Sequence, residues 1–170
     1  MRDVLIIDGY NIIGAWGELR KLVKQDGLEE ARDLLIEKLI EYQASTGREV
    51  YIVFDAYKVP GIRQQYTQKQ LHILYTKQDE TADELIEKMV RVSEKYTSQI
   101  YVATSDFTEQ QITFGDGALR ITARELIQEI DRVKKKVRER VAKMEQQPKR
   151  TLGDALDPGI SKIFEIWRRK

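Results

Sequence analysis

The sequence contains no cysteine, and this absence excludes several classes of protein. Without thiols there is no disulfide scaffold, no thiolate metal site and no cysteine nucleophile. The chain also lacks an apolar run long enough to cross a membrane, and its N-terminus does not show the charged and apolar segments of a secretory signal. We therefore expect a soluble, cytoplasmic protein without a membrane partner.

Histidine is nearly absent as well, since His72 is the only one. It falls at the start of an expected strand. A general base is conceivable there, but the position favours a structural or surface role.

The net charge of +1 conceals an uneven distribution of charge along the chain. Residues 1–117 carry 14 basic and 20 acidic side chains, whereas residues 118–150 carry 11 basic and 5 acidic ones, so the two parts have net charges of −6 and +6. An acidic body suggests a site that collects cations, and a basic segment suggests contact with a polyanion. At 170 residues we expect one compact domain over residues 1–130 and a basic helical extension over residues 131–170.

The most informative stretch is residues 4–14, VLIIDGYNIIG. Four apolar residues run without a break into Asp8, which is typical of a strand buried on both faces of a parallel sheet. Gly9 then turns the chain, and Asn11 can face the same point. Ligands of open α/β sheets bind outside the carboxyl ends of the strands, although Asp8 could instead only cap the following helix.

Two further apolar runs repeat this arrangement. The runs at residues 50–54 and 100–103 lead into Asp55 and Asp106. A third strand is expected at residues 71–76, a loop beside the site at residues 57–70, a short helix and turn at residues 12–24, and helices at residues 28–46, 79–96, 107–114, 123–144 and 158–169. Alternating strands and helices predict an α/β fold with a parallel sheet packed in three layers.

In this fold Asp8, Asp55 and Asp106 could converge, and Asp83 could reach them from the start of a helix. Four close carboxylates need a counter-cation, because each like-charged neighbour otherwise raises a pKa. Oxygen ligands without cysteine favour Mg²⁺ or Mn²⁺, bound as one ion or two. Such a site is suited to phosphoryl chemistry, in which the metal activates a water molecule and stabilises the charge on the leaving oxygen.

Five segments, taken in order, resemble a known family: VLIIDGYNIIGAW, IVFDA, ETADELIE, VATSDFTEQ and GALRITARELI. They are similar to the YacP-like branch of the NYN domains, within the PIN-like nuclease superfamily, over roughly residues 3–130 and more weakly in the basic tail. The resemblance implies a PIN-like (NYN) fold and a metal-dependent endoribonuclease that cleaves mRNA on the ribosome.

The resemblance also implies roles for individual residues. Asp8, Asp83 and Asp106 match the family's metal-binding acids, Asp55 an additional acid, and Asn11 and Ser105 supporting polar positions. We therefore predict catalytic roles for Asp8, Asp83, Asp106 and Asn11. Metal binding is expected of the four aspartates, and supporting roles of Ser105 and of Glu80, which shares a helix face with Asp83.

The long basic helix independently suggests RNA as a partner. Its basic side chains outnumber its acids, and they would give sequence-independent, salt-sensitive contacts to phosphates. We predict RNA binding by Lys134, Lys135, Lys136, Arg138 and Arg140, and by Arg120 and Arg124 nearer the site. A solvated helix face is the alternative for this segment alone. Loop residues Tyr57, Arg63 and Tyr66 could stack on or clamp unpaired bases, or simply pack on the body.

Two alternatives to the nuclease remain. One is a non-catalytic RNA- or ribosome-binding module that uses the basic helix. The other is a phosphotransfer or phosphatase domain with Asp8 as nucleophile, which is disfavoured because Tyr10 stands where a second acid is commonly found. The sequence favours no particular oligomeric state.

Overall fold

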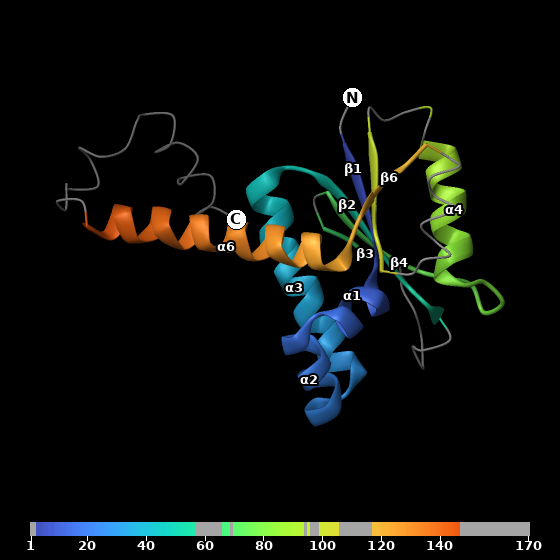
Figure 1. The fold of residues 1–170 in the computed structure, drawn as a ribbon, viewed down its shortest axis with the longest axis horizontal. Helices are drawn as coiled ribbons and strands as arrows, with labels where there is room; N and C mark the ends of the chain where they lie inside the picture. Colours follow the sequence, from blue (N-terminus) through green and yellow to red (C-terminus); the bar gives the residue numbers. More distant parts are fainter. Residues whose placement is uncertain are drawn as a thin grey trace, which may run out of the picture. The chain divides into compact units, whose positions relative to one another are not determined.

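The computed structural model describes residues 3–56, 66–68, 70–93, 95, 99–105 and 117–146. Within these residues the chain forms six strands and five helices (Figure 1). The strands are β1 (Val4–Asp8), β2 (Glu49–Phe54), β3 (Tyr66–Gln68), β4 (Leu71–Tyr75), β5 (Ile100–Ala103) and β6 (Leu119–Ile121). The helices are α1 (Gly9–Ala15), α2 (Gly17–Asp26), α3 (Leu28–Thr46), α4 (Ala82–Ser93) and α6 (Ala123–Gln146).

The strands form one mixed sheet in the order β3-β4-β2-β1-β5-β6. Strand β1 lies between β2 and β5, and these strands, together with β4 and β6, run parallel. Only β3 is antiparallel, at the edge beside β4. The carboxyl ends of the five parallel strands therefore share one edge of the sheet, and β1 delivers Asp8 to the middle of that edge.

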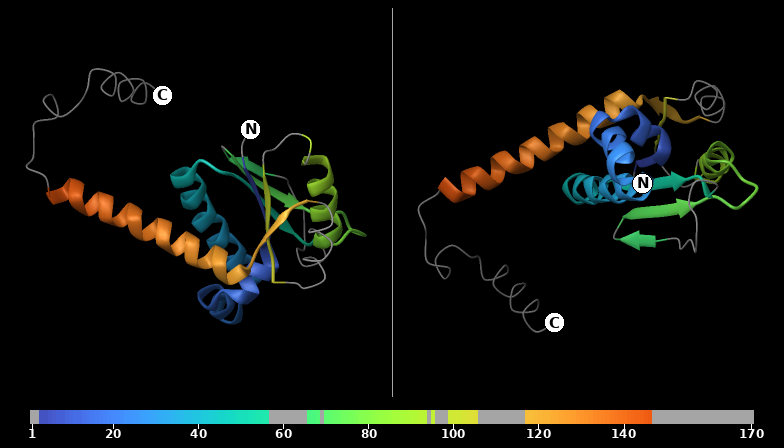
Figure 2. Two further views of the ribbon diagram at one scale, coloured as in Figure 1. Left: turned by 45° about the horizontal axis from the view of Figure 1, so that its top comes forward. Right: turned by 90° about the horizontal axis from the view of Figure 1, so that it is seen from below.

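Helices cover both faces of the sheet, so the predicted α/β fold with three-layer packing is confirmed (Figures 1 and 2). Leu5 and Ile7 of β1 pack with α1, α2, α3 and the first turns of α6. Val4 and Ile6 point the other way and pack with α4. Because both faces are covered, β1 is buried along its whole length and its sequence shows no alternation of apolar and polar residues.

Most predicted elements are confirmed, with small differences at their ends. The helix at residues 28–46 is observed with the same bounds, and it ends at Gly47, whose φ of 70° is a left-handed conformation that suits glycine. The short helix and turn expected at residues 12–24 are instead two short helices separated by Trp16. The helix expected at residues 79–96 begins later, at Ala82, and ends at Ser93.

Two short edge strands were not predicted. Residues 57–70 were expected to be a loop, but Tyr66–Gln68 forms β3. Strand β6 was missed because it has no apolar alternation: Leu119 and Arg120 are exposed, and the strand pairs only with β5. The expected helices at residues 107–114 and 158–169, and the loop residues Tyr57 and Arg63, lie outside the described residues.

The chain divides into two compact units, with the boundary between Lys136 and Val137, inside α6. In the first unit, Leu126 and Ile130 of α6 are buried in the core. In the second unit, Val137, Val141 and Met144 are 40%, 48% and 73% exposed. No helix in the described part of the chain combines the length and the apolar character needed to cross a membrane.

Candidate active site

Asp8 occupies the centre of the candidate active site, at the carboxyl end of β1. Its side chain is only 9% exposed. It lies opposite Val53 of β2 and directly follows Ile7, which is paired with Ala103 of β5. Its Oδ1 accepts a hydrogen bond of 3.4 Å from the backbone N–H of Asn11, so Asp8 also caps α1. The capping role and a functional role are compatible, since a carboxylate oxygen can accept a hydrogen bond and also bind a cation.

Asn11 connects the end of β1 to the end of β5. Its Oδ1 accepts two hydrogen bonds from Ser105, one of 2.7 Å from the backbone N–H and one of 2.9 Å from the hydroxyl. These contacts join residues 94 positions apart in the sequence. The predicted supporting pair, Asn11 and Ser105, is therefore brought together, and it fixes the backbone just before Asp106.

Asp55 lies at the same edge of the sheet, directly after β2. It is partly exposed, and among the described residues its carboxylate has no hydrogen bond or salt bridge. Its charge is close enough to Tyr10 to disfavour ionisation of that hydroxyl, adding to burial, which is the main cause of the raised pKa of Tyr10. No described residue thus competes with a cation for this carboxylate.

Helix α4, which carries Asp83, covers the other face of the sheet and begins near this edge (Figure 1). The connection from β4 to α4 is short, so α4 begins near the carboxyl ends of the strands, and it packs over β1 and β2 (Figure 1). Asp83 lies in its first turn and is partly exposed. Among the described residues its side chain has neither a hydrogen bond nor a salt bridge. A carboxylate in the first turn is also favoured by the helix dipole.

Glu80 has local partners instead. Its Oε2 is 2.7 Å from Nζ of Lys88, and its Oε1 accepts a 3.4 Å hydrogen bond from the backbone N–H of Lys77. The hydrogen bond to Lys88 is the main reason that the pKa of Glu80 is lowered. Glu80 therefore lies in the turn that precedes α4, and its contacts with Lys77 and Lys88 stabilise this turn. The turn leads directly into the first turn of α4, which carries Asp83.

The donor atoms at this edge fit a hard divalent cation in kind, since all are carboxylate oxygens. Within the described residues, however, no three His, Cys, Asp or Glu side chains lie close enough together to hold a metal ion. Asp106, the fourth predicted acid, lies outside the described residues. The four-acid metal site remains a prediction.

The predicted RNA-binding residues lie on β6 and α6. Arg120 and Arg124 are exposed at the strand and at the first turn of the helix, which Thr122 caps by accepting a 3.1 Å hydrogen bond from the backbone N–H of Glu125. The basic residues further along α6 form no salt bridge with any described residue; they are Lys134, Lys135, Lys136, Arg138 and Arg140. No described residue therefore neutralises their charge in a salt bridge.

A cluster beside Asp55 was not predicted from the sequence. The rings of Tyr10, Phe54 and Tyr75, which we call the aromatic row, lie across the ends of β1, β2 and β4. Nη1 of Arg32 on α3 donates a 3.5 Å hydrogen bond to the Tyr10 hydroxyl. These residues are far apart in the sequence, and no spacing pattern connects Arg32 to the site.

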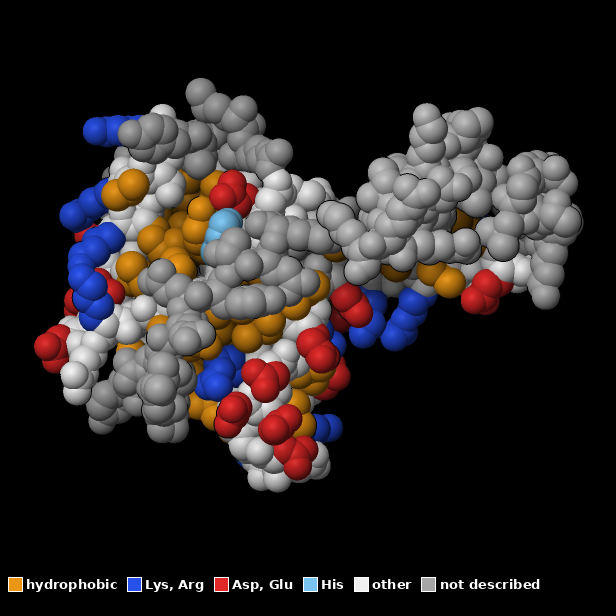
Figure 3. Space-filling model, turned by 180° about the vertical axis from the view of Figure 1, so that it is seen from behind, with side chains coloured by type: hydrophobic (Ala, Val, Ile, Leu, Met, Phe, Trp, Pro, Cys, Tyr) orange, Lys and Arg blue, Asp and Glu red, His pale blue; other side chains and the backbone are white. Residues whose placement is uncertain are grey.

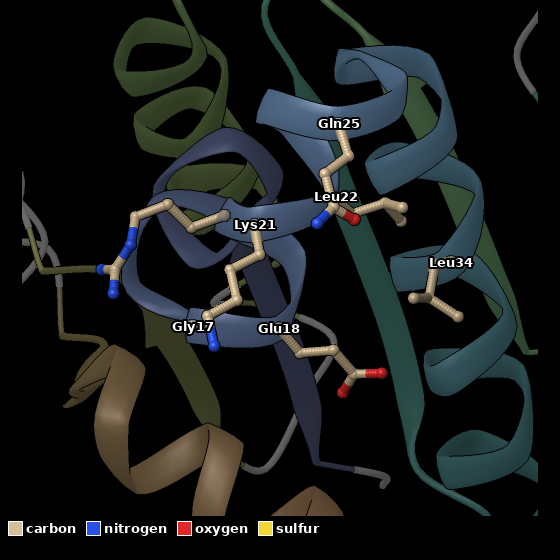
Figure 4. A pocket seen from close by; sticks show the side chains of 7 residues that line it. Gly17, Glu18, Lys21, Leu22, Gln25 and Leu34 are labelled. Atoms are coloured by element: carbon tan, nitrogen blue, oxygen red, sulfur yellow. The ribbon is translucent and has the colours of Figure 1, made fainter.

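Two other features are excluded as the active site. A cavity of about 670 Å³ lies between α2 and α3 and is lined by Leu22 of α2 and Leu34 of α3 (Figure 4). Its acid, Glu18, is paired with Lys38. His72 lies in β4 opposite Tyr51, stacks on that ring and pairs with Glu49 at 3.3 Å. This position, nearer the amino ends of the strands, supports a structural role.

A parallel α/β sheet flanked by helices, with acidic and amide side chains at the ends of its central strands, is the architecture of the PIN-like nuclease class. The chain belongs to the family described as YacP-like NYN domain, which it matches over residues 5–169. NYN domains have a nuclease-like, PIN-like fold. The predicted family and fold are thus confirmed.

Similar proteins from Bacillus subtilis support this assignment. The chain is 46% identical over 168 residues to the protein YacP of strain 168, covering 98% of this chain and 97% of that protein. It also matches the crystal structure of Rae1 (YacP) with a TM-score of 0.76, covering 98% and 95% of the two chains. A crystal structure of a single-residue variant of Rae1 matches with a TM-score of 0.75 over 85% of each chain.

Proposed function

We propose that this protein is a metal-dependent endoribonuclease that cleaves mRNA in association with the translating ribosome. The observation that supports this most strongly is the nearly buried Asp8 at the end of the central strand, with Asp55 after the neighbouring strand and Asp83 at the start of α4. Helix capping explains a carboxylate at Asp8 and the helix dipole favours one at Asp83, but neither explains why three separate elements bring carboxylates to one edge of the sheet.

Asp8, Asp55, Asp83 and Asp106 would hold Mg²⁺ or Mn²⁺. The bound ion would lower the pKa of a water molecule for attack on a phosphodiester and offset the charge on the leaving oxygen. The chain's own residues would position these groups. The backbone N–H of Asn11 orients the Asp8 carboxylate, and its side chain holds the end of β5 through Ser105.

The decisive variant is Asp8→Asn. Asparagine keeps an oxygen that can accept from Asn11, so the cap and the fold should persist, while the charge needed for the metal is lost. We expect cleavage to fall to the level seen without metal. Asp26→Asn, an exposed acid at the end of α2, makes the same chemical change away from the site and should cleave as wild type does.

The assay would map new 5′ ends on ribosome-bound mRNA for the wild type and both variants. Naked RNA would be tested alongside, with and without Mg²⁺ or Mn²⁺. New ends that need Asp8 would support the nuclease, and their restriction to ribosome-bound mRNA would support the ribosome as part of the active complex. Cleavage by Asp8→Asn equal to that of the wild type would contradict the proposed mechanism.

A second candidate function is a non-catalytic RNA- or ribosome-binding module. Two observations favour it: the described residues bring no three acids into metal-binding distance, and the basic side chains of α6 are unpaired within the described chain. This candidate predicts tight binding of RNA or ribosomes without new 5′ ends under any metal condition.

A further inference from the structure

We propose that Arg32, held by Tyr10, forms a binding subsite for a phosphate of single-stranded RNA next to the candidate active site. This inference rests on the proposed function, because it assumes that the strand ends bind RNA. It assigns a substrate contact to the α3 side of the site, where the sequence indicated none.

The first argument is the state of the Arg32 side chain. It is only partly exposed, and its single hydrogen bond to a described residue is the 3.5 Å contact to the Tyr10 hydroxyl. Among the described residues no carboxylate lies within salt-bridge distance of it. A guanidinium has five N–H donors in a planar fork that matches phosphate oxygens, so most of its binding capacity remains.

The second argument is the position of the cluster. Tyr10 follows Asp8 by two residues, and its ring lies 5.1 Å from that of Phe54, the residue just before Asp55. Phe54 is paired in register with Tyr75, and their rings are 5.8 Å apart. The aromatic row therefore connects Arg32 to the strand ends that present Asp8 and Asp55.

The third argument is the charge around the cluster. The acidic residues of α3 are all exposed; they are Glu29, Glu30, Asp33, Glu37 and Glu41. Figure 3 shows acidic side chains gathered at the lower end of the molecule in that view. These exposed acids disfavour the approach of a polyanion across the solvent-facing side of α3. Arg32 instead contacts Tyr10 of α1 at the edge of the sheet. A phosphate of an RNA strand bound at Asp8 would therefore reach Arg32 from that edge.

The alternative is that Arg32 only supports Tyr10 structurally. The two roles differ in their salt dependence. Loss of one phosphate contact lowers the slope of log affinity against log salt concentration by about 0.7 for a single strand. Loss of a structural contact lowers the stability of the fold and leaves that slope unchanged.

The test is the binding of a fluorescently labelled single-stranded RNA to the full chain in EDTA, titrated at several salt concentrations. For Arg32→Gln we expect affinity to fall about tenfold, as for loss of a charged hydrogen bond, and the salt slope to fall by about 0.7. Arg20→Gln is the matched control, because it removes the same charge from an exposed position on α2. It should retain the wild-type slope.

Two more variants keep the test valid if Arg32→Gln folds poorly. Arg32→Lys retains the charge without the fork, so it should retain the slope and lose part of the affinity. Tyr10→Phe retains the ring but removes the hydroxyl that holds the Arg32 guanidinium. It should likewise retain the salt slope and lose part of the affinity. Urea midpoints of all variants would show whether each protein is folded under the binding conditions.

Wild-type affinity and slope in folded Arg32→Gln would overturn the subsite, as would an unchanged slope with weaker binding, or no RNA binding by the wild type. The binding assay needs no cleavage, so the two proposals fail separately. If no condition yields new 5′ ends but Arg32→Gln loses the phosphate contact, the subsite stands and the nuclease does not.

Discussion

Gly9 shows how closely the site depends on one small residue. A Cβ atom at this position would lie 2.3 Å from Cε1 of Phe54, well inside van der Waals contact. Phe54 is fully buried and has a ring neighbour on either side, Tyr10 and Tyr75, so it has no room to move. The aspartate at the end of β1 can be followed directly by α1 only because residue 9 has no side chain.

We therefore expect Gly9→Ala to destabilise the protein by about 1–3 kcal/mol, as overpacking of a core does. Gly14→Ala is the matched control, since nothing lies within 4 Å of its Cβ position and the residue is inside α1. Alanine there should stabilise the helix by about 0.5–1 kcal/mol. Urea denaturation measures both changes. Equal stability of the two variants would show that Phe54 can shift.

At the scale of elements, α6 is attached to α3 by a small polar cluster. The Tyr42 hydroxyl donates a 2.9 Å hydrogen bond to Glu129 and accepts one of 3.0 Å from Arg48. Arg48 and Glu129 are themselves 3.6 Å apart, and the guanidinium lies over the Tyr101 ring. Because Tyr42 is 1% exposed, its hydroxyl is satisfied by these partners rather than by solvent.

This cluster predicts a loss of stability at high pH. Burial, and then the neighbouring Glu129, raise the pKa of Tyr42 to about 12, against the opposing effect of Arg48. An unfolded tyrosine titrates near 10, so between pH 10 and 12 the unfolded chain releases the proton first. The contribution of Tyr42 is therefore complete below pH 10 and is lost toward pH 12, with a slope of up to about 1.4 kcal/mol per pH unit.

Tyr42→Phe should remove this contribution, which urea denaturation across the alkaline range would detect. At pH 7 the variant should lose about 1 kcal/mol, since Arg48 and Glu129 can still pair. Tyr51→Phe is a useful comparison, because burial also raises the pKa of Tyr51 to about 12 and its hydroxyl bonds to Glu49 instead. A wild-type alkaline slope in Tyr42→Phe would contradict the assignment.

The elements also show what could be predicted from the sequence. Strand β1 and helix α3 have strong local signals, an unbroken apolar run in one and helical spacing ended by Gly47 in the other. Strands β3 and β6 exist only through pairing with a neighbour, and three residues at a sheet edge leave no periodic pattern. Whether such short segments form strands depends on tertiary contacts rather than on local sequence.

The same distinction applies to the site. Asp8 and Asp55 were predictable because a polar residue directly after a buried run marks a strand end. The partnership of Asn11 with Ser105 required the order of strands, which places β5 next to β1. Arg32 gave no signal, since its contact with Tyr10 depends on how α3 packs against α1. The local sequence pattern is enough to predict acids at strand ends, whereas the residues that contact the site depend on how the elements pack.

At the scale of the whole molecule, the division of charge separates two tasks. Residues 1–117 have a net charge of −6, and under the proposed function the acids at the strand ends would hold a cation that binds the phosphate to be cleaved. Residues 118–150 have a net charge of +6, and we predict that they bind the RNA backbone without a cation. Affinity for RNA should therefore come mainly from β6 and α6, with cleavage dependent on the sheet edge.

Replacing Lys134, Lys135 and Lys136 together by glutamine tests this division. Glutamine forms helices as well as lysine does, so α6 should persist. If all three contact phosphates, the salt slope for single-stranded RNA should fall by about 2, three times the contribution of one contact.

The control replaces Arg20, Lys21 and Lys24 by glutamine, which changes the net charge equally at exposed positions on a different helix, α2. Long-range attraction depends on total charge and would weaken binding similarly in both triple variants. Direct contact would lower the slope only in the α6 variant. Equal salt slopes in the two triple variants would show that α6 attracts RNA by its charge without contacting the phosphates directly. The direct contacts to RNA would then have to lie elsewhere, and the edge of the sheet, with Arg32 and Tyr10, would be the next place to test.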